Sequence, residues 1–409
     1  MKKKLQICLF APLLLIAVNN LQAKDKMGLK QVLRQALDNH PFIIAGEYSL
    51  QASEMLIKQA EKINNPTLSI EREDFGLSSP EQAKTKIALS YPINWKQRQT
   101  QVEIADADKN LTFIELQNNK ALLIKEISHL FVTVLGKQEQ QEIAHDEVNI
   151  AKSVLEIVRG RAQAGRISPV EETKAALTLN QAVVQEQDNI IAFNQAVEKL
   201  KYLLGMNHGK PLELQDDLSF TATLPELNIF LQKIPDTQTY KSWTMKLKKQ
   251  DSIIQHAQAK QWPEISISAG LIQFETGGEK ALSVAMDIEL PIFDRNAAQI
   301  DAEKANLLAL KTKQANVKLQ VQQQVIQAYF NWQAALNRLN MLKNQIIPQA
   351  KEIFDAAQDS YSLGKLSYLD VLDAERSLVA ARKQYINSYV AYHHARIKMD
   401  YLSYGADEE

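Results

Sequence analysis

The residues best placed for chemistry are two pairs of carboxylates that follow glycine-containing turns. Asp370 and Asp373 are three residues apart, so on a helix their side chains share one face. Glu171 and Glu172 occupy the corresponding place in the first half of the chain. Carboxylates grouped in this way attract cations, but each can also be a solvated residue of a first helical turn, favoured there by the helix dipole. The residues alone leave both interpretations open.

The sequence contains no recognisable enzyme motif. A nucleophile elbow, a phosphate loop, a nucleotide fingerprint and a metalloprotease helix are all missing from it. The seven histidines are scattered. The adjacent His393 and His394 would point about 100° apart on a helix, so one metal site is not expected to use both. We therefore expect no catalysis, no cofactor and no bound metal.

The composition excludes several classes of protein. The 409 residues include 47 Lys and Arg against 48 Asp and Glu, a balance that gives no electrostatic reason to bind nucleic acid. The single cysteine, Cys8, rules out a disulfide framework. Only 13 glycines and 12 prolines interrupt the chain, which favours long continuous elements.

Residues 1–23 are predicted to be a signal peptide. A basic head precedes an apolar stretch from Ile7 to Val18, and Ala23 provides a small residue at a plausible cleavage point. A short membrane anchor is the alternative, but this stretch is too short to span a bilayer comfortably. No later segment has about 18 consecutive apolar residues, so the exported chain is expected to be periplasmic, secreted or a β-spanning outer-membrane protein.

The rest of the chain is internally duplicated. From Pro92 onward the two halves match at a constant offset of 199 residues, a register that is hard to obtain by chance. We expect a first repeat at 24–205, a linker at 206–239 that packs beside the helices, a second repeat at 240–404 and a short tail at 405–409. The matching pairs are Gly165 and Gly364, Ser168 and Ser367, Ala175 and Ala374, Ala182 and Ala381, and Tyr202 and Tyr401.

Each repeat is predicted to contain a helix, a β-hairpin and two long helices. The expected strands cover about 66–75, 84–93, 263–274 and 281–292, and apolar and polar residues alternate along them with the period of two that strands require. An ordinary half-buried hairpin would show the same pattern. Strands of about ten residues can also cross a bilayer when tilted, but only as part of a closed barrel. Four strands cannot close around a lumen, so spanning hairpins would need several chains to share one barrel.

The long helices are expected at about 96–161, 168–205, 295–360 and 367–404, with Pro348 as the one strong interruption. Helices of about 65 residues would be on the order of 100 Å long, which implies coiled-coil packing. A solid coiled coil without a lumen would explain them equally well. The predicted seams are Leu116, Leu123, Ile127, Leu130 and Val134 in the first repeat, and Val371, Ala374, Leu378, Ala381, Tyr385, Tyr392, Ala395, Met399 and Leu402 in the last helix.

Two glycines mark the turns between the long helices. Gly165 and Gly364 are expected just past a helix end, and Ser168 and Ser367 can cap the helix that follows. These tips should therefore lie at the end of the molecule opposite the hairpins.

The tip sequences carry a resemblance to a known family. YSLGKLSYLDVLDAERSL, at 361–378, resembles the second-repeat tip motif of TolC-like outer membrane factors. RAQAGRISPVEETKAAL, at 161–177, is similar to the branch that serves heavy-metal efflux pumps of the cobalt–zinc–cadmium type. The resemblance implies a mainly α fold with a small β part. In it, a homotrimer forms a 12-stranded outer-membrane β-barrel that continues into a long periplasmic α-helical coiled-coil barrel.

The same resemblance implies a function and partners. It points to the exit duct of a tripartite efflux system, working with a periplasmic adaptor and an inner-membrane proton-driven pump of the RND type, and surrounded by outer-membrane lipid. Heavy-metal cations are the expected substrate. Drugs or secreted polypeptides are alternatives within the class, and a structural periplasmic coiled-coil protein is the alternative outside it.

The resemblance also assigns roles to residues. Asp370 and Asp373 match the acidic pair of the periplasmic constriction, where three copies would place six carboxylates around a narrow opening that favours cations. Tyr361 matches a gate residue, although Ser or Tyr replaces its basic partner in this chain. Glu171 and Glu172 would form a second acidic set. The candidate adaptor contacts are Gly165, Arg166, Gly364, Lys365 and Leu366.

Overall fold

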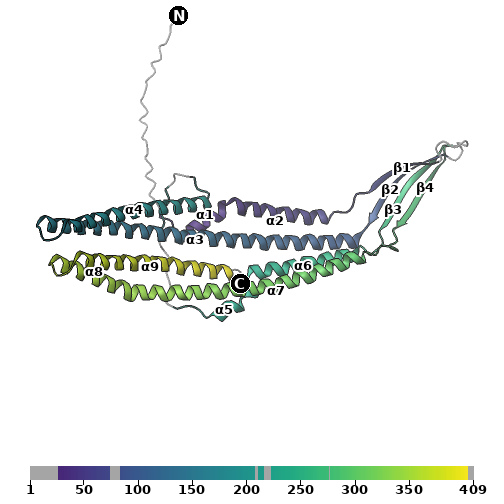
Figure 1. The fold of residues 1–409 in the computed structure, drawn as a ribbon. Helices are drawn as coiled ribbons and strands as arrows, with labels where there is room; N and C mark the ends of the chain where they lie inside the picture. The colour runs from purple at the N-terminus through teal and green to yellow at the C-terminus, as the bar shows by residue number, and fades with distance from the viewer. Residues whose placement is uncertain (1–25, 74–82, 208–210, 216–222, 276, 404–409) are drawn as a thin grey trace, which may run out of the picture.

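The computed structural model describes residues 26–73, 83–207, 211–215, 223–275 and 277–403. The predicted signal peptide and tail, residues 74–75 of the first expected strand and parts of the linker lie outside these ranges. The molecule is elongated (Figure 1): long helices run side by side, the strands project at one end, and the turns between the long helices lie at the other. The hairpins and the glycine tips are therefore at opposite ends.

The first repeat forms four helices and one hairpin. Its elements are α1 (Leu29–Asn39), α2 (Pro41–Ala60), β1 (Thr67–Glu73), β2 (Lys84–Ile93), α3 (Trp95–Gln163) and α4 (Pro169–Leu203). Where one helix was expected before the hairpin, the structure has two. The break falls at His40, because Pro41 lacks an N–H and is best accommodated at the first position of a new helix.

The second repeat has the same order of elements. After α5 (Leu227–Gln232) and a 3-10 turn (Ile234–Asp236) in the linker come α6 (Gln238–Ala259), β3 (Ile265–Phe274), β4 (Lys280–Ile288), α7 (Ala297–Met341), α8 (Ile347–Ser362) and α9 (Tyr368–Leu402). A π-helical turn, Leu342–Ile346, joins α7 to α8. Pro348 follows this turn and cannot donate to an i−4 carbonyl, so the wider turn keeps the helix continuous past the proline.

β4 ends at Ile288, four residues before the expected limit at 292. Beyond this end, Glu289 N still donates to the Glu264 carbonyl oxygen at 3.0 Å. All four strands form one antiparallel sheet in the order β1-β2-β3-β4, so the central β2–β3 pair joins the hairpins of the two repeats. In this pair Ala88 lies opposite Gly270, where a Cβ would come within 2.4 Å of the Ile87 carbonyl oxygen.

The helices pack along the predicted seams. All five seam residues of α3 are buried, and so are the seam residues of α9 except Tyr385, which is half-buried. α3 has 69 residues and packs against α2, α4, α6 and α9, so it connects the two repeats along most of the molecule. Among the residues described, none of the helices combines the length and apolar character that a membrane crossing requires.

Candidate functional site

The four-stranded sheet has one apolar face that is open to its surroundings. Cross-strand neighbours on this face include Leu68 with Leu89 and Leu271 with Leu282. The exposed fraction reaches 77% at Leu282 and 71% at Val284. Large apolar side chains left open in such a contiguous patch mark a surface that meets a protein or a membrane.

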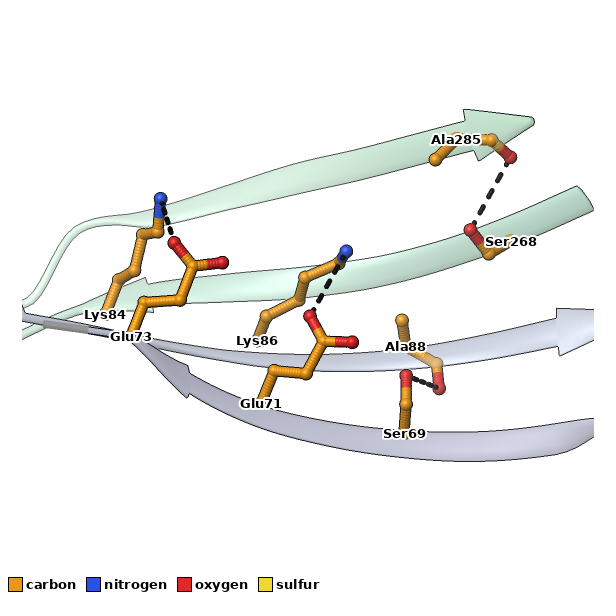
Figure 2. A network of polar contacts seen from close by, with 8 residues as sticks. All are labelled: Ser69, Glu71, Glu73, Lys84, Lys86, Ala88, Ser268 and Ala285. Atoms are coloured by element: carbon orange, nitrogen blue, oxygen red, sulfur yellow. Dashed lines mark hydrogen bonds and ion pairs between the residues drawn. The ribbon is translucent and has the colours of Figure 1, made fainter. Parts of the chain in front are cut away.

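The opposite face of the sheet is small and polar. Figure 2 shows part of it: Ser69 donates to the Ala88 carbonyl oxygen at 3.3 Å and Ser268 to the Ala285 carbonyl oxygen at 3.5 Å. Two ion pairs continue this face toward the β1–β2 turn. They join Lys86 Nζ to a Glu71 carboxylate oxygen at 3.7 Å and Lys84 Nζ to a Glu73 carboxylate oxygen at 2.7 Å. Water-compatible groups on one face and apolar groups on the other are typical of a strand between an aqueous lumen and lipid.

The two tips at the far end share one backbone geometry. Gly165 and Gly364 have φ angles of 69° and 75°, which a residue with a Cβ rarely adopts. Arg166 N donates to the Arg161 carbonyl oxygen at 3.0 Å, and Lys365 N donates to the Ser360 carbonyl oxygen at 2.9 Å. These bonds close both helix ends in the manner of a Schellman motif, as the sequence predicts.

The predicted acidic pair divides into two environments. Asp370 accepts hydrogen bonds from Ser367 N at 2.8 Å and Ser367 Oγ at 2.7 Å, completing a capping box at the start of α9. These hydrogen bonds, from the side chain and then the backbone of Ser367, hold the pKa of the Asp370 carboxyl below its usual value. Asp373, one turn later, is exposed as Asp370 is, but lies outside this capping box. Of the two, Asp373 has its carboxylate more available to a passing ion.

The two carboxylates of the first-repeat pair, Glu171 and Glu172, also lie in different environments. Glu172 forms an ion pair with Arg159, whose Nε lies 3.0 Å from a Glu172 carboxylate oxygen. Glu171 is half-buried and lies close enough to Tyr361 to act on its pKa electrostatically. The structure therefore brings one predicted residue from each repeat, Glu171 and Tyr361, to the same place.

Sequence reasoning missed the basic partner of Tyr361, which is Arg161. Arg161 Nη1 donates to the Tyr361 carbonyl oxygen at 2.7 Å, and its guanidinium carbon lies 4.5 Å from the centre of the Tyr361 ring. Tyr361 is buried, its hydroxyl has no hydrogen-bond partner among the described residues, and burial raises its pKa. A basic residue in the turn before Gly165 was the available signal, but the sequence could not show which residue it contacts.

Glu375 is a second residue that the sequence did not single out. It lies on α9 one turn beyond Asp370 and is only 5% exposed. Burial, followed by the nearby carboxylate of Glu147, raises the pKa of Glu375 to about 7. A buried carboxyl of this kind changes its charge within the physiological pH range.

The described residues contain no group of three or more His, Cys, Asp and Glu side chains placed to hold a metal ion. His393 packs edge-on against Tyr389, whereas the ring of His394 lies 4.4 Å from that of His129. The two adjacent histidines thus face different neighbours, as their helical spacing predicts.

A family model described as "Outer membrane efflux protein" matches residues 32–206 and 243–402, which is most of the chain. The chain belongs to the outer membrane efflux protein family. It is therefore an outer-membrane efflux protein with a large periplasmic helical part, as the tip motifs predict.

Individual relatives agree with this assignment. The chain is 24% identical to the cobalt-zinc-cadmium resistance protein CzcC of Cupriavidus metallidurans, over 89% of this chain and 87% of the relative. It is 23% identical to the pyoverdine export outer membrane protein OpmQ of Pseudomonas aeruginosa, over 72% of this chain and 64% of the relative. The solved structure of CusC matches with a TM-score of 0.77 and 17% identity, covering 92% of both chains, and so shows that the fold is shared. Members of this family are transporters rather than enzymes.

Proposed function

We propose that the chain is the outer-membrane exit duct of a tripartite efflux system and that its cargo is heavy-metal cations. The observation that carries the choice of cargo is the similarity to the cobalt-zinc-cadmium resistance protein CzcC, which extends over 89% of the chain. The similarity to the pyoverdine exporter covers less of the chain, 72%. The first-repeat tip motif at 161–177 favours the same choice.

We infer that three copies close the duct. Within one chain, β1 and β4 are each paired on one side only among the described strands. Unpaired strand edges are costly in lipid, and joining β4 of one copy to β1 of the next removes them. Three copies give 12 strands, with the apolar face toward lipid and the polar face around the lumen. The repeats at 24–205 and 240–404 would then each contribute one hairpin and one pair of long helices, with the linker at 206–239 beside them.

The tips are the proposed gate and docking surface. Asp370 and Asp373, with Glu171 and Glu172, would line the periplasmic opening, and Tyr361 would hold it shut. A periplasmic adaptor would dock on the turns and connect the duct to an inner-membrane pump of the RND type. Exposed apolar side chains beside the turns, Leu363 and Leu366 among them, support a protein-binding role for this end.

The test is growth of a deletion strain, with and without the restored gene, on zinc, cobalt, cadmium, nickel, copper and silver salts and on a panel of hydrophobic drugs. Sensitivity confined to a set of metal cations, reversed by the gene, is the expected result. Sensitivity to drugs alone would contradict the metal cargo while leaving the duct in place.

A further inference from the structure

The outer half of the polar sheet face carries four charged side chains on β1 and β2. A level is a row of residues that lie opposite one another across the strands, and the charges of β1 and β2 cancel within each level. Glu71 lies directly across from Lys86, and Glu73 lies directly across from Lys84. At the same two levels β3 contributes the uncharged Ile272 and Phe274. Within β1, β2 and β3, each of these two levels therefore holds one carboxylate and one ammonium group.

The levels closer to the helices carry little charge. One level consists of Ser69, Ala88, Gly270 and Ser283, which are all small and neutral. Asp287, at the helical end of β4, is the only other charged residue on this face of the described strands. The Glu71–Lys86 and Glu73–Lys84 levels are thus the part of this face where the loss of the lysines would leave a dense group of carboxylates.

The contribution of these two ion pairs to folding stability is too small to explain their presence. The lysine side chains are 26% and 33% exposed and their carboxylate partners about half exposed, and ion pairs this open to water add little to folding. A charge on a lumen wall, by contrast, acts on every ion that passes, with a reach of about 10 Å at 0.1 M salt.

We propose that Lys84 and Lys86 neutralise Glu71 and Glu73 so that the outer exit of the duct does not retain divalent cations. Without the lysines, three copies would surround the exit with twelve unpaired carboxylate oxygens, and clustered carboxylates are the ligands that hard divalent cations prefer. With the lysines in place, the carboxylates of Glu71 and Glu73 are neutralised, so cations are not bound at the exit and leave the duct. The inference rests on the proposed function in requiring that three copies close the duct and that the polar face line its exit.

The experiment reads the local potential at Ser69, two residues from Glu71 on the same face. The sequence contains no cysteine after Cys8, so Ser69→Cys introduces one thiol into the mature protein. The rates at which a cationic and an anionic methanethiosulfonate reagent of similar size modify it, added outside intact cells, give a ratio that depends on nearby charge. A constriction elsewhere in the duct does not enter this ratio.

In the Ser69→Cys background, Lys84→Gln with Lys86→Gln should raise the cationic-to-anionic ratio roughly two- to ten-fold at low salt and much less at 1 M salt. Glu71→Gln with Glu73→Gln should lower it. The control is Lys280→Gln, which removes one positive charge at the outer end of β4 on the apolar face. The variant that neutralises all four residues should return the ratio to its starting value.

A ratio that changes no more in the double lysine variant than in Lys280→Gln overturns the inference. So does a Ser69→Cys thiol that resists both reagents while an Ile70→Cys thiol, on the other face, reacts. The growth test on metal salts is scored separately, because a duct with another cargo would still give the expected thiol ratios. Failure of the metal assignment and failure of this inference are therefore distinguishable.

Discussion

Arg161 and Tyr361 come from different repeats and meet at the tip of the molecule, where Arg161 Nη1 donates a 2.7 Å hydrogen bond to the Tyr361 carbonyl oxygen. The same guanidinium group lies over the Tyr361 ring, 4.5 Å from its centre. One side chain thus fixes both the backbone and the ring of a residue in the last turn of α8. The contact links the last turn of α3 to the last turn of α8, just before both glycine turns.

Arg161→Ala should loosen this end of the duct. A hydrogen bond from a charged donor contributes about 1.5–3 kcal/mol, and each 1.4 kcal/mol is about ten-fold in an equilibrium. We therefore expect the open probability, measured in single-channel recordings in planar bilayers, to rise on the order of ten-fold. Arg382→Ala is the control, because it breaks another contact between the repeats, the 3.3 Å ion pair of Arg382 with Asp146, without touching a proposed gate residue. Equal open probability in the two variants would show that the Arg161–Tyr361 contact does not restrain the tip.

The two aspartates of the predicted gate should behave differently when replaced. Asp370→Ala removes the acceptor of the capping box and should lower the melting temperature. Asp373→Ala removes an exposed carboxylate and should leave the melting temperature unchanged while it weakens cation selectivity, seen as a smaller reversal potential across a salt gradient. If both variants lose selectivity and neither loses stability, the capping role of Asp370 is wrong.

Glu375 should make stability depend on pH. Its pKa is about 7 in the folded chain against a usual value of 4.5, so between these values the folded state holds a proton that the unfolded state has released. Stability should therefore fall as pH rises from about 4.5 to 7, by about 3 kcal/mol in total. Glu375→Gln should remove this slope and melt several degrees higher than the unmodified protein at pH 8, with equal melting at pH 5. Glu156→Gln, an exposed change on the nearby part of α3, is the control and should keep the slope.

The tip turns should contact the adaptor. A photo-crosslinker at Lys365 or Leu366, both exposed, should capture a periplasmic adaptor in cells, whereas one at the equally exposed Lys311 in the middle of α7 should not. Gly364→Ala should reduce capture, because a Cβ is strained at a φ of 75° and the turn must change shape. Capture at Lys311 but never at the tips would place docking elsewhere.

Local signals in the sequence were enough to predict much of this architecture. Alternation predicts the strands, the heptad seam predicts the buried face of α9, and Gly364 with Ser367 predicts the turn between α8 and α9. Contacts between distant segments could not be predicted in this way. The Arg161–Tyr361 contact depends on how α3 packs against α8, and the burial of Glu375 depends on where its neighbour Glu147 lies on α3. Such contacts are set by three-dimensional packing, which periodicity along one helix does not specify.

The pairing of β2 with β3 depends on Gly270 having no side chain. A Cβ at this position would lie 2.4 Å from the Ile87 carbonyl oxygen and 2.7 Å from the Ala88 Cβ, so the two hairpins could not keep their register. Gly270→Ala should therefore reduce the amount of folded protein in the outer membrane, measured by fractionation and by the heat-stable oligomer on gels. Gly160→Ala, within α3, is the matched control, because nothing lies within 4 Å of its added Cβ. Alanine at position 160 should stabilise the helix by about 0.5–1 kcal/mol. Equal losses of folded outer-membrane protein in both variants would therefore show that the β2–β3 pairing does not depend on the missing side chain at Gly270.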